Sequence, residues 1–111
     1  MKLPREVTIA RAKVTDYLLV RQDRGDKSAF LQRGGYSPHN PSQLIADLNG
    51  LARESDAALV EENEFGRYYE VSGFLLGPTG VRLRVRTIWI TEHLSGRTKF
   101  ITLIPLEVFR R

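Results

Sequence analysis

Residues 81–92 read Val-Arg-Leu-Arg-Val-Arg-Thr-Ile-Trp-Ile-Thr-Glu, and their first half alternates apolar and basic side chains. Successive side chains of a β-strand point to opposite faces of its sheet. Three guanidinium groups then form a column on one face at a spacing of about 7 Å, those of Arg82, Arg84 and Arg86. Such close like charges repel unless the face is wet or has anionic neighbours. We expect a central strand whose other face, which includes Trp89, lies in the core.

Two apolar residues, Ile88 and Ile90, fall on the arginine face when the alternation is continued. Either a loop covers that end of the strand, or a β-bulge changes the alternation there. The sequence leaves both explanations open.

From residue 57 onward the apolar period is two, which is typical of strands, and turn signals interrupt it. Four strands are predicted, at residues 57–62, 67–76, 81–91 and 99–106, joined by turns at 63–66, 77–80 and 93–97. Pro105 has no backbone N–H, which suits an edge strand or the end of a strand.

The N-terminal half shows the three-and-four spacing of helices. Helices are predicted at residues 9–21, 27–33 and 41–55. Asp26 is expected to cap the second helix, Gly34 and Gly35 to end it, and Asn40 with Pro41 to begin the third. Helices grouped before strands indicate the α+β class. We therefore predict a single domain over residues 1–111, with three N-terminal helices packed on one face of a four-stranded antiparallel meander sheet.

The chain of 111 residues has no Cys and two His, so neither a disulfide nor a zinc site is expected. Motifs of nucleotide-binding loops and of serine or metal hydrolases are missing, so no cofactor or metal is predicted. The apolar runs are far too short to span a membrane, and the N-terminal residues lack the apolar core of a signal peptide. We expect a cytoplasmic protein without membrane contact.

The net charge is +4 and the sequence pI is ≈ 9.8. A basic domain suits nucleic acid or an acidic protein as partner, although such a surplus also serves solubility alone. Clustering favours the first explanation. Basic residues gather in the hairpin that contains the arginine column and at the chain end: Arg82, Arg84, Arg86, Arg97, Lys99, Arg110 and Arg111.

The arginine column has two interpretations. Carboxylates on neighbouring strands, such as Glu70 and Glu61 or Glu62, would pair with it and make it structural. Alternatively, guanidinium groups bind phosphate oxygens as a rigid fork, and they would stabilise the charge that develops on phosphate oxygens in an RNA-cleaving site.

Arg24 and Lys27 lie at the start of the second predicted helix, where free backbone N–H groups favour an anion. A solvated loop charge is the simpler explanation for both. His39 and His93 are the candidate general bases near neutral pH. Neither lies in a context that specifies catalysis, so an exposed loop histidine also explains them.

Short motifs along nearly the whole chain resemble a family of short bacterial and archaeal proteins with a Gly-x-x-Lys segment and a Val-Arg-x-x-Trp strand. The matching stretches are residues 2–4, 13–19, 25–30, 44–51, 66–68, 80 with 85–90, and 100–103. That family looks like toxins of toxin–antitoxin pairs and like C-terminal toxin domains. It implies a relationship to the barnase–EndoU–colicin–RelE group of metal-free ribonucleases, in which N-terminal helices pack on a four-stranded antiparallel sheet. Lys27, Arg86, Thr87 and Trp89 occupy motif positions, and Asp26 stands where a His or another residue is expected beside the Lys.

The resemblance and the arginine face together suggest a metal-independent endoribonuclease, a hydrolase toxin that binds RNA and is neutralised by a small acidic antitoxin. The expected catalytic residues are Lys27, Arg86, Thr87 and His39, and the expected substrate-binding residues are Arg82, Arg84, Arg24 and Arg97. The alternatives are a non-catalytic basic module for nucleic acid or an acidic protein, and an adaptor subunit that forms a homodimer through an edge strand.

Overall fold

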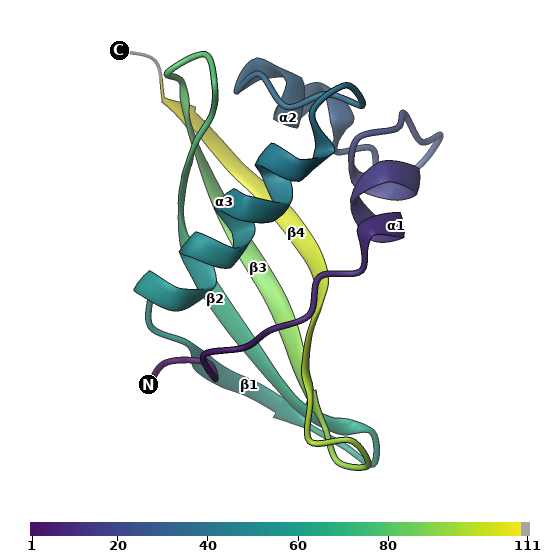
Figure 1. The fold of residues 1–111 in the computed structure, drawn as a ribbon, viewed down its shortest axis with the longest axis vertical. Coiled ribbons are helices and arrows are strands. Elements are labelled where there is room, and N and C mark those ends of the chain that lie inside the picture. Colours follow the sequence, from purple (N-terminus) through teal and green to yellow (C-terminus); the bar gives the residue numbers. More distant parts are fainter. Residues whose placement is uncertain (110–111) are drawn as a thin grey trace.

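The computed structural model describes residues 1–109, and its helices precede its strands (Figure 1). The elements are α1 (Arg11–Lys13), η1 (Val14–Leu18), α2 (Ser28–Arg33), α3 (Pro41–Glu54), β1 (Ala58–Glu62), β2 (Gly66–Leu76), β3 (Arg82–Glu92) and β4 (Thr98–Phe109). The strands form one antiparallel sheet in the order β1-β2-β3-β4, which confirms the predicted α+β meander. Arg110 and Arg111, two of the clustered basic residues, lie outside the described residues. No helix in the described part is long and apolar enough to cross a membrane.

The first helix is shorter than predicted and changes type along its length. Thr8 pairs with the outer edge of β4, since its N–H donates to Thr98 and its C=O accepts from Phe100, so the chain is still extended there. A single α-turn then leads into the π-helical η1, where the Leu19 N–H reaches back five residues to the Val14 C=O at 3.0 Å. Tertiary pairing with β4 thus delays the helix that the periodicity predicts from residue 9.

Helix α2 begins one residue later than predicted, at Ser28, so Lys27 and not Asp26 is its N-cap residue, whereas its end at Gly34 is as predicted. The Asp26 carboxylate accepts the backbone N–H of Ser28 at 3.2 Å and its hydroxyl at 2.7 Å. Gly35 has a φ of +94°, in the left-handed region that favours glycine, and it closes the helix with the Gly35 N–H on the Gln32 C=O.

The core lies between the helices and one face of the sheet. Helix α3 contributes a stripe at the predicted spacing, Leu44, Leu48, Leu51 and Ala52. Trp89 of β3 is fully buried and packs edge-to-face on Phe100 with ring centroids 5.3 Å apart. Its predicted role as a core anchor is confirmed.

The alternation of β3 continues unbroken to Ile90. The two register shifts against β4, between Arg84 and Val85 and between Ile88 and Trp89, leave the inside–outside pattern of β3 intact. Ile90 is half-buried and lines a small cavity with residues of the segment before η1, including Ala10 and Lys13. The alternation of β3 is thus unchanged at this end, and the segment before η1 lies across a cavity from Ile90.

Candidate functional site

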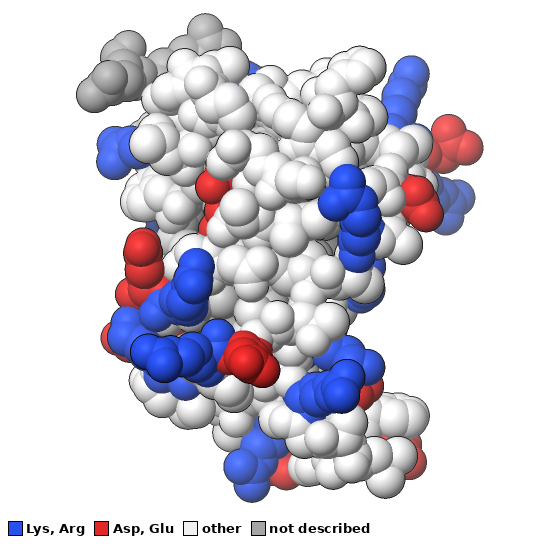
Figure 2. Space-filling model, viewed as in Figure 1, with Lys and Arg blue, Asp and Glu red and all other residues white. Residues whose placement is uncertain are grey.

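The open face of the sheet is the face opposite the helices, and strand register identifies its residues. Ser72 of β2 and Ile104 of β4 lie directly opposite Arg86 of β3, and directly opposite residues share a face. Arg82, Arg84 and Arg86 are all exposed there, as the alternation predicts. Figure 2 shows the helical side, where Lys and Arg mix with Asp and Glu around a largely uncharged centre. The column of like charges on β3 lies on the opposite face, the open one.

Two of the three column arginines are paired with carboxylates on adjacent strands. Arg84 Nη1 lies 3.3 Å from Glu107 Oε1 of β4. Arg86 Nε contacts Glu70 Oε1 of β2, the partner that the structural interpretation names. Half-exposed pairs of this kind stabilise a fold by only about 0–1 kcal/mol. They compensate charge, and within residues 1–109 the terminal nitrogens of the Arg86 guanidinium have no carboxylate partner.

The third arginine, Arg82, lies against two aromatic rings. Its guanidinium carbon is 5.1 Å from the ring centroid of Phe74 and 6.0 Å from that of Phe109. The rings pack edge-to-face with their centroids 5.5 Å apart, and Phe74 is 46% exposed. This end of the open face presents planar groups on which a planar ligand can stack.

The half-buried amine of Lys27 lies beside β4, the strand next to the arginine column. Lys27 Nζ donates to Thr102 Oγ1 at 2.6 Å and lies 5.5 Å from the Tyr17 ring centroid. Removal from water lowers the pKa of the Lys27 amine below its ordinary value. Thr102 is opposite Ile88, which is in turn opposite Glu70. Two strand spacings therefore separate the backbones of Thr102 and Glu70, about 10 Å.

The loop before α2 holds Lys27 in this position. Asp26 also accepts the Gln22 N–H at 3.2 Å, so one carboxylate closes the loop on both sides. The hydrogen bond from the Ser28 hydroxyl lowers the pKa of Asp26, which keeps the acceptor ionised. Only Asp26 separates Gly25 from Lys27, so the Gly-x-x-Lys spacing of the resemblance is not met here.

Lys27 contacts Thr102 of β4, the strand beside the column arginines, whereas the other candidates lie elsewhere. Thr87 is fully buried on the core face, opposite in direction to Arg86. His39 is exposed in the loop between α2 and α3 and is fixed by its backbone N–H on Ser37 Oγ. Arg24 is exposed in the loop before α2, and Arg97 is exposed in the turn between β3 and β4. Within residues 1–109 no three His, Cys, Asp or Glu residues gather in a way that could hold a metal.

Glu70 and Thr102 are the site residues that sequence reasoning did not assign to the chemistry. A four-residue turn at 77–80 would place Leu76 opposite Val81, whereas the structure pairs Leu76 with Arg82 and therefore Glu70 with Ile88. The connection spans residues 77–81, with the Gly77 N–H on the Val81 C=O, so the predicted turn did not give the position of Glu70. The position of Lys27 beside Thr102 was not accessible, because the two residues are 75 positions apart.

The fold and the open face define an α+β protein with a basic, partly aromatic sheet surface. The chain belongs to a family described as a domain of unknown function (DUF6883), whose model matches residues 2–107. No curated protein sequence matches the chain. Its fold is similar to that of a chain in a solved structure, "Contact-dependent growth inhibition toxin - immunity protein complex from Klebsiella pneumoniae 342". The TM-score is 0.69 at 19% sequence identity, and the match covers 89% of this chain and 92% of that chain. At this identity the likeness concerns the fold.

Proposed function

We propose that this protein is a metal-independent endoribonuclease of the toxin type, whose site lies on the open face between the Glu70–Arg86 pair and Lys27. The observation that carries the proposal is a carboxylate and a guanidinium paired on the open face, with an ammonium group bound to Thr102, whose backbone is about 10 Å from that of Glu70. These are a general base, a charge stabiliser and a general acid, which RNA cleavage by its own 2′-hydroxyl requires. The resemblance to the barnase–EndoU–colicin–RelE group supports the same class, as does the fold shared with a chain of a toxin–immunity protein complex.

The reaction assigns one step to each group. Glu70 takes the proton of the 2′-hydroxyl while that oxygen forms a bond to the adjacent phosphorus. The bond from phosphorus to the 5′-oxygen breaks, and the Lys27 ammonium donates a proton to this leaving oxygen. The terminal nitrogens of Arg86 bind the non-bridging oxygens, where negative charge grows in the transition state. The products are a 2′,3′-cyclic phosphate and a 5′-hydroxyl. The lowered pKa of Lys27 makes it a better proton donor than an exposed lysine.

The neighbouring residues extend this site along the RNA. Arg84 lies two residues before Arg86 on β3 and on the same face, where it can bind the next phosphate. Arg82 and Phe74 offer the surface on which an unpaired base stacks. Arg24 adds positive charge on the loop that holds Lys27. Thr87 lies on the core face of the same strand, where it accepts the Trp89 Nε1–H, and takes no part in the reaction.

Purified protein and a fluorescently labelled RNA oligonucleotide, with excess chelator present, test this function. Arg86→Ala is expected to lower the cleavage rate about 10²–10³-fold, and Glu70→Gln by about 10²–10⁴-fold. Arg53→Ala, which removes an exposed arginine of α3 on the helical side, is the matched control and should cleave like wild type. A substrate with a 2′-deoxy sugar at the cleavage position should resist cleavage.

The proposed function fails if the wild-type protein neither cleaves RNA nor arrests growth when it is expressed. Cleavage that stops when the chelator is added also contradicts it, because the proposed groups need no metal. Equal losses in Arg86→Ala and Arg53→Ala would place the site elsewhere.

A second candidate, a non-catalytic basic binding module, is favoured by the intramolecular partners of the column. Arg84 and Arg86 are already paired with Glu107 and Glu70, as in a charge-balanced surface. This function predicts RNA or acidic-protein binding that weakens with salt and shows no turnover. A small acidic antitoxin is the partner that a basic toxin of this kind would take on the same face, and homodimers are the alternative assembly. The cleavage assay separates the two candidates directly.

A further inference from the structure

Strand β2 has a free outer edge beyond the point where β1 ends. The last residue pair between β1 and β2 joins Ala58 to Glu70, whereas β2 pairs with β3 as far as Leu76. Within residues 1–109, residues 71–76 therefore have a strand neighbour on one side only.

The backbone groups on this edge can be identified from the ends of the hairpins. The Gly66 C=O accepts the Asn63 N–H on the β1 side, and the Phe65 C=O accepts the His93 N–H on the β3 side. Backbone groups alternate in direction along a strand that carries no bulge. The N–H and C=O groups of Ser72 and Phe74 therefore point outward, as those of Gly66 do. Among the described residues, none of these four groups has a backbone partner.

The other edges of the sheet are protected in the ways that folded proteins commonly use. The outer edge of β4 has Pro105, two register shifts and the pairing with Thr8, and Lys13 Nζ donates to the Ile101 C=O at 2.8 Å. Strand β1 has two glutamates and a register shift. Residues 71–76 read Val-Ser-Gly-Phe-Leu-Leu, with no charge and no proline, and their pairing with β3 has no register shift. This edge keeps the features of a template for another strand.

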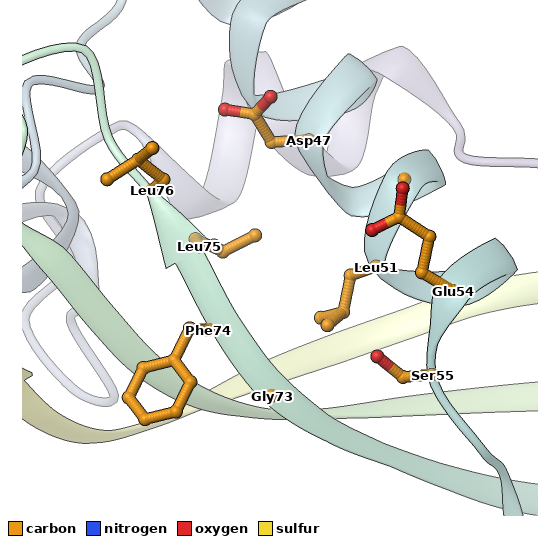
Figure 3. A pocket seen from close by; sticks show the side chains of 9 residues that line it. Asp47, Leu51, Glu54, Ser55, Gly73, Phe74, Leu75 and Leu76 are labelled. Carbon is orange, nitrogen blue, oxygen red and sulfur yellow. The ribbon is translucent and has the colours of Figure 1, made fainter.

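A groove of about 400 Å³ runs between this edge and α3 (Figure 3). Its sheet side is formed by residues 73–76, and its helix side includes Asp47, Gly50 and Glu54. Figure 3 shows both carboxylates on the helix side of the groove. A Cβ added to Gly50 would meet no atom within 4 Å, so the middle of the groove is open. Within the described part of the chain no basic side chain lines the groove, although the protein has a net charge of +4.

We propose that this edge and groove dock an extended segment of another protein, which adds a strand to β2 and directs Lys or Arg side chains toward α3. Side chains of an added strand alternate, so every second one faces the helix. Asp47 and Glu54 are seven residues apart on α3, about 10.5 Å along its axis. Basic residues two or four positions apart on a strand, about 7–14 Å, can reach both.

Charge complementarity selects a basic partner over a second copy of this chain. Antiparallel pairing of two copies through residues 71–76 would bring two acidic grooves together, with Asp47 and Glu54 of each copy near those of the other. Like charges brought together in this way oppose association. A basic segment gains both the backbone bonds of Ser72 and Phe74 and the attraction of the groove.

The test uses ¹⁵N-labelled protein and, as the probe, an acetylated peptide of alternating Lys and Val. The expected result is a shift of the Ser72 and Phe74 amide signals and about tenfold slower hydrogen exchange at both. The matched peptide with Glu in place of Lys should leave both amides unchanged. Protection of neither amide by the Lys peptide, or equal effects of the two peptides, would overturn the proposal.

Variants in matched pairs distinguish edge pairing from general attraction. Ser72→Pro removes one outward N–H without removing a bond to β3 and should weaken binding about tenfold or more, whereas Ser72→Ala should bind like wild type. Glu54→Lys should weaken binding, and Glu64→Lys, the same charge change in the exposed turn between β1 and β2, should change it little. Equal effects within either pair would contradict the proposal. RNA cleavage is a separate readout, so failure here leaves the proposed function intact.

Discussion

Replacement of Thr87 by Val separates the structural role of this residue from a role in the reaction. Thr87 Oγ1 donates to the Val71 C=O at 2.7 Å and accepts Trp89 Nε1–H at 2.8 Å, and both side chains are fully buried. Valine keeps the shape and removes both bonds. A hydrogen bond contributes about 0.5–1.5 kcal/mol, and a buried donor left without a partner costs about 1–3 kcal/mol. The free energy of unfolding should therefore fall by about 2–4 kcal/mol, a large part of the usual 5–15 kcal/mol.

Urea unfolding followed by the fluorescence of Trp89, the single tryptophan, measures this loss directly. The midpoint should fall while the denaturant slope stays the same, because the same surface is exposed on unfolding. Thr87→Ser is the control, since it keeps the hydroxyl and loses one methyl group. RNA cleavage per folded molecule should match wild type in both variants.

Two results would contradict a purely structural role of the Thr87 hydroxyl. Wild-type stability of Thr87→Val would mean that the hydroxyl bridge does not support the core. A fall in cleavage under conditions where Thr87→Val is fully folded would mean that Thr87 takes part in the reaction.

Three further outcomes follow from the packing of the helical side. Gly50→Ala should stabilise the protein by about 1 kcal/mol, because the added Cβ has free space inside α3; a lowered melting temperature would contradict this. Gly77→Ala should destabilise it by about 1–3 kcal/mol, because the Cβ would overlap the Gly34 carbonyl oxygen; unchanged stability would count against this packing. The buried Tyr36 hydroxyl donates to Asp47 at 2.6 Å, and burial raises its pKa. Unfolded tyrosine ionises above about pH 10 while folded Tyr36 keeps its proton, so stability should fall from there upward by up to about 1.4 kcal/mol per pH unit. Tyr36→Phe should lose this part of the slope in urea unfolding across that range.

Local patterns along the chain are enough to predict the class of the fold and the two faces of β3. Alternation that begins at residue 81 assigns Trp89 to the core and Arg86 to the open face. The register of the hairpin, with Leu76 opposite Arg82, differs by one residue from that of a turn at 77–80. The grouping of helices before strands determined the α+β class. These signals are local and periodic, so neighbouring residues carry them without knowledge of the rest of the chain.

Packing between distant segments fixes which groups meet on the open face and along the sheet edge. Lys27 reaches Thr102 because the loop before α2 packs beside β4, and Thr8 pairs with β4 in place of starting a helix. The free edge at Ser72 exists because β1 begins at Ala58, opposite Glu70, and no strand pairs with β2 beyond that point among the described residues. Each of these contacts joins residues distant in sequence, and their geometry depends on strand register and helix packing. No local pattern encodes that information, because the free energy that selects it comes from the whole packed core.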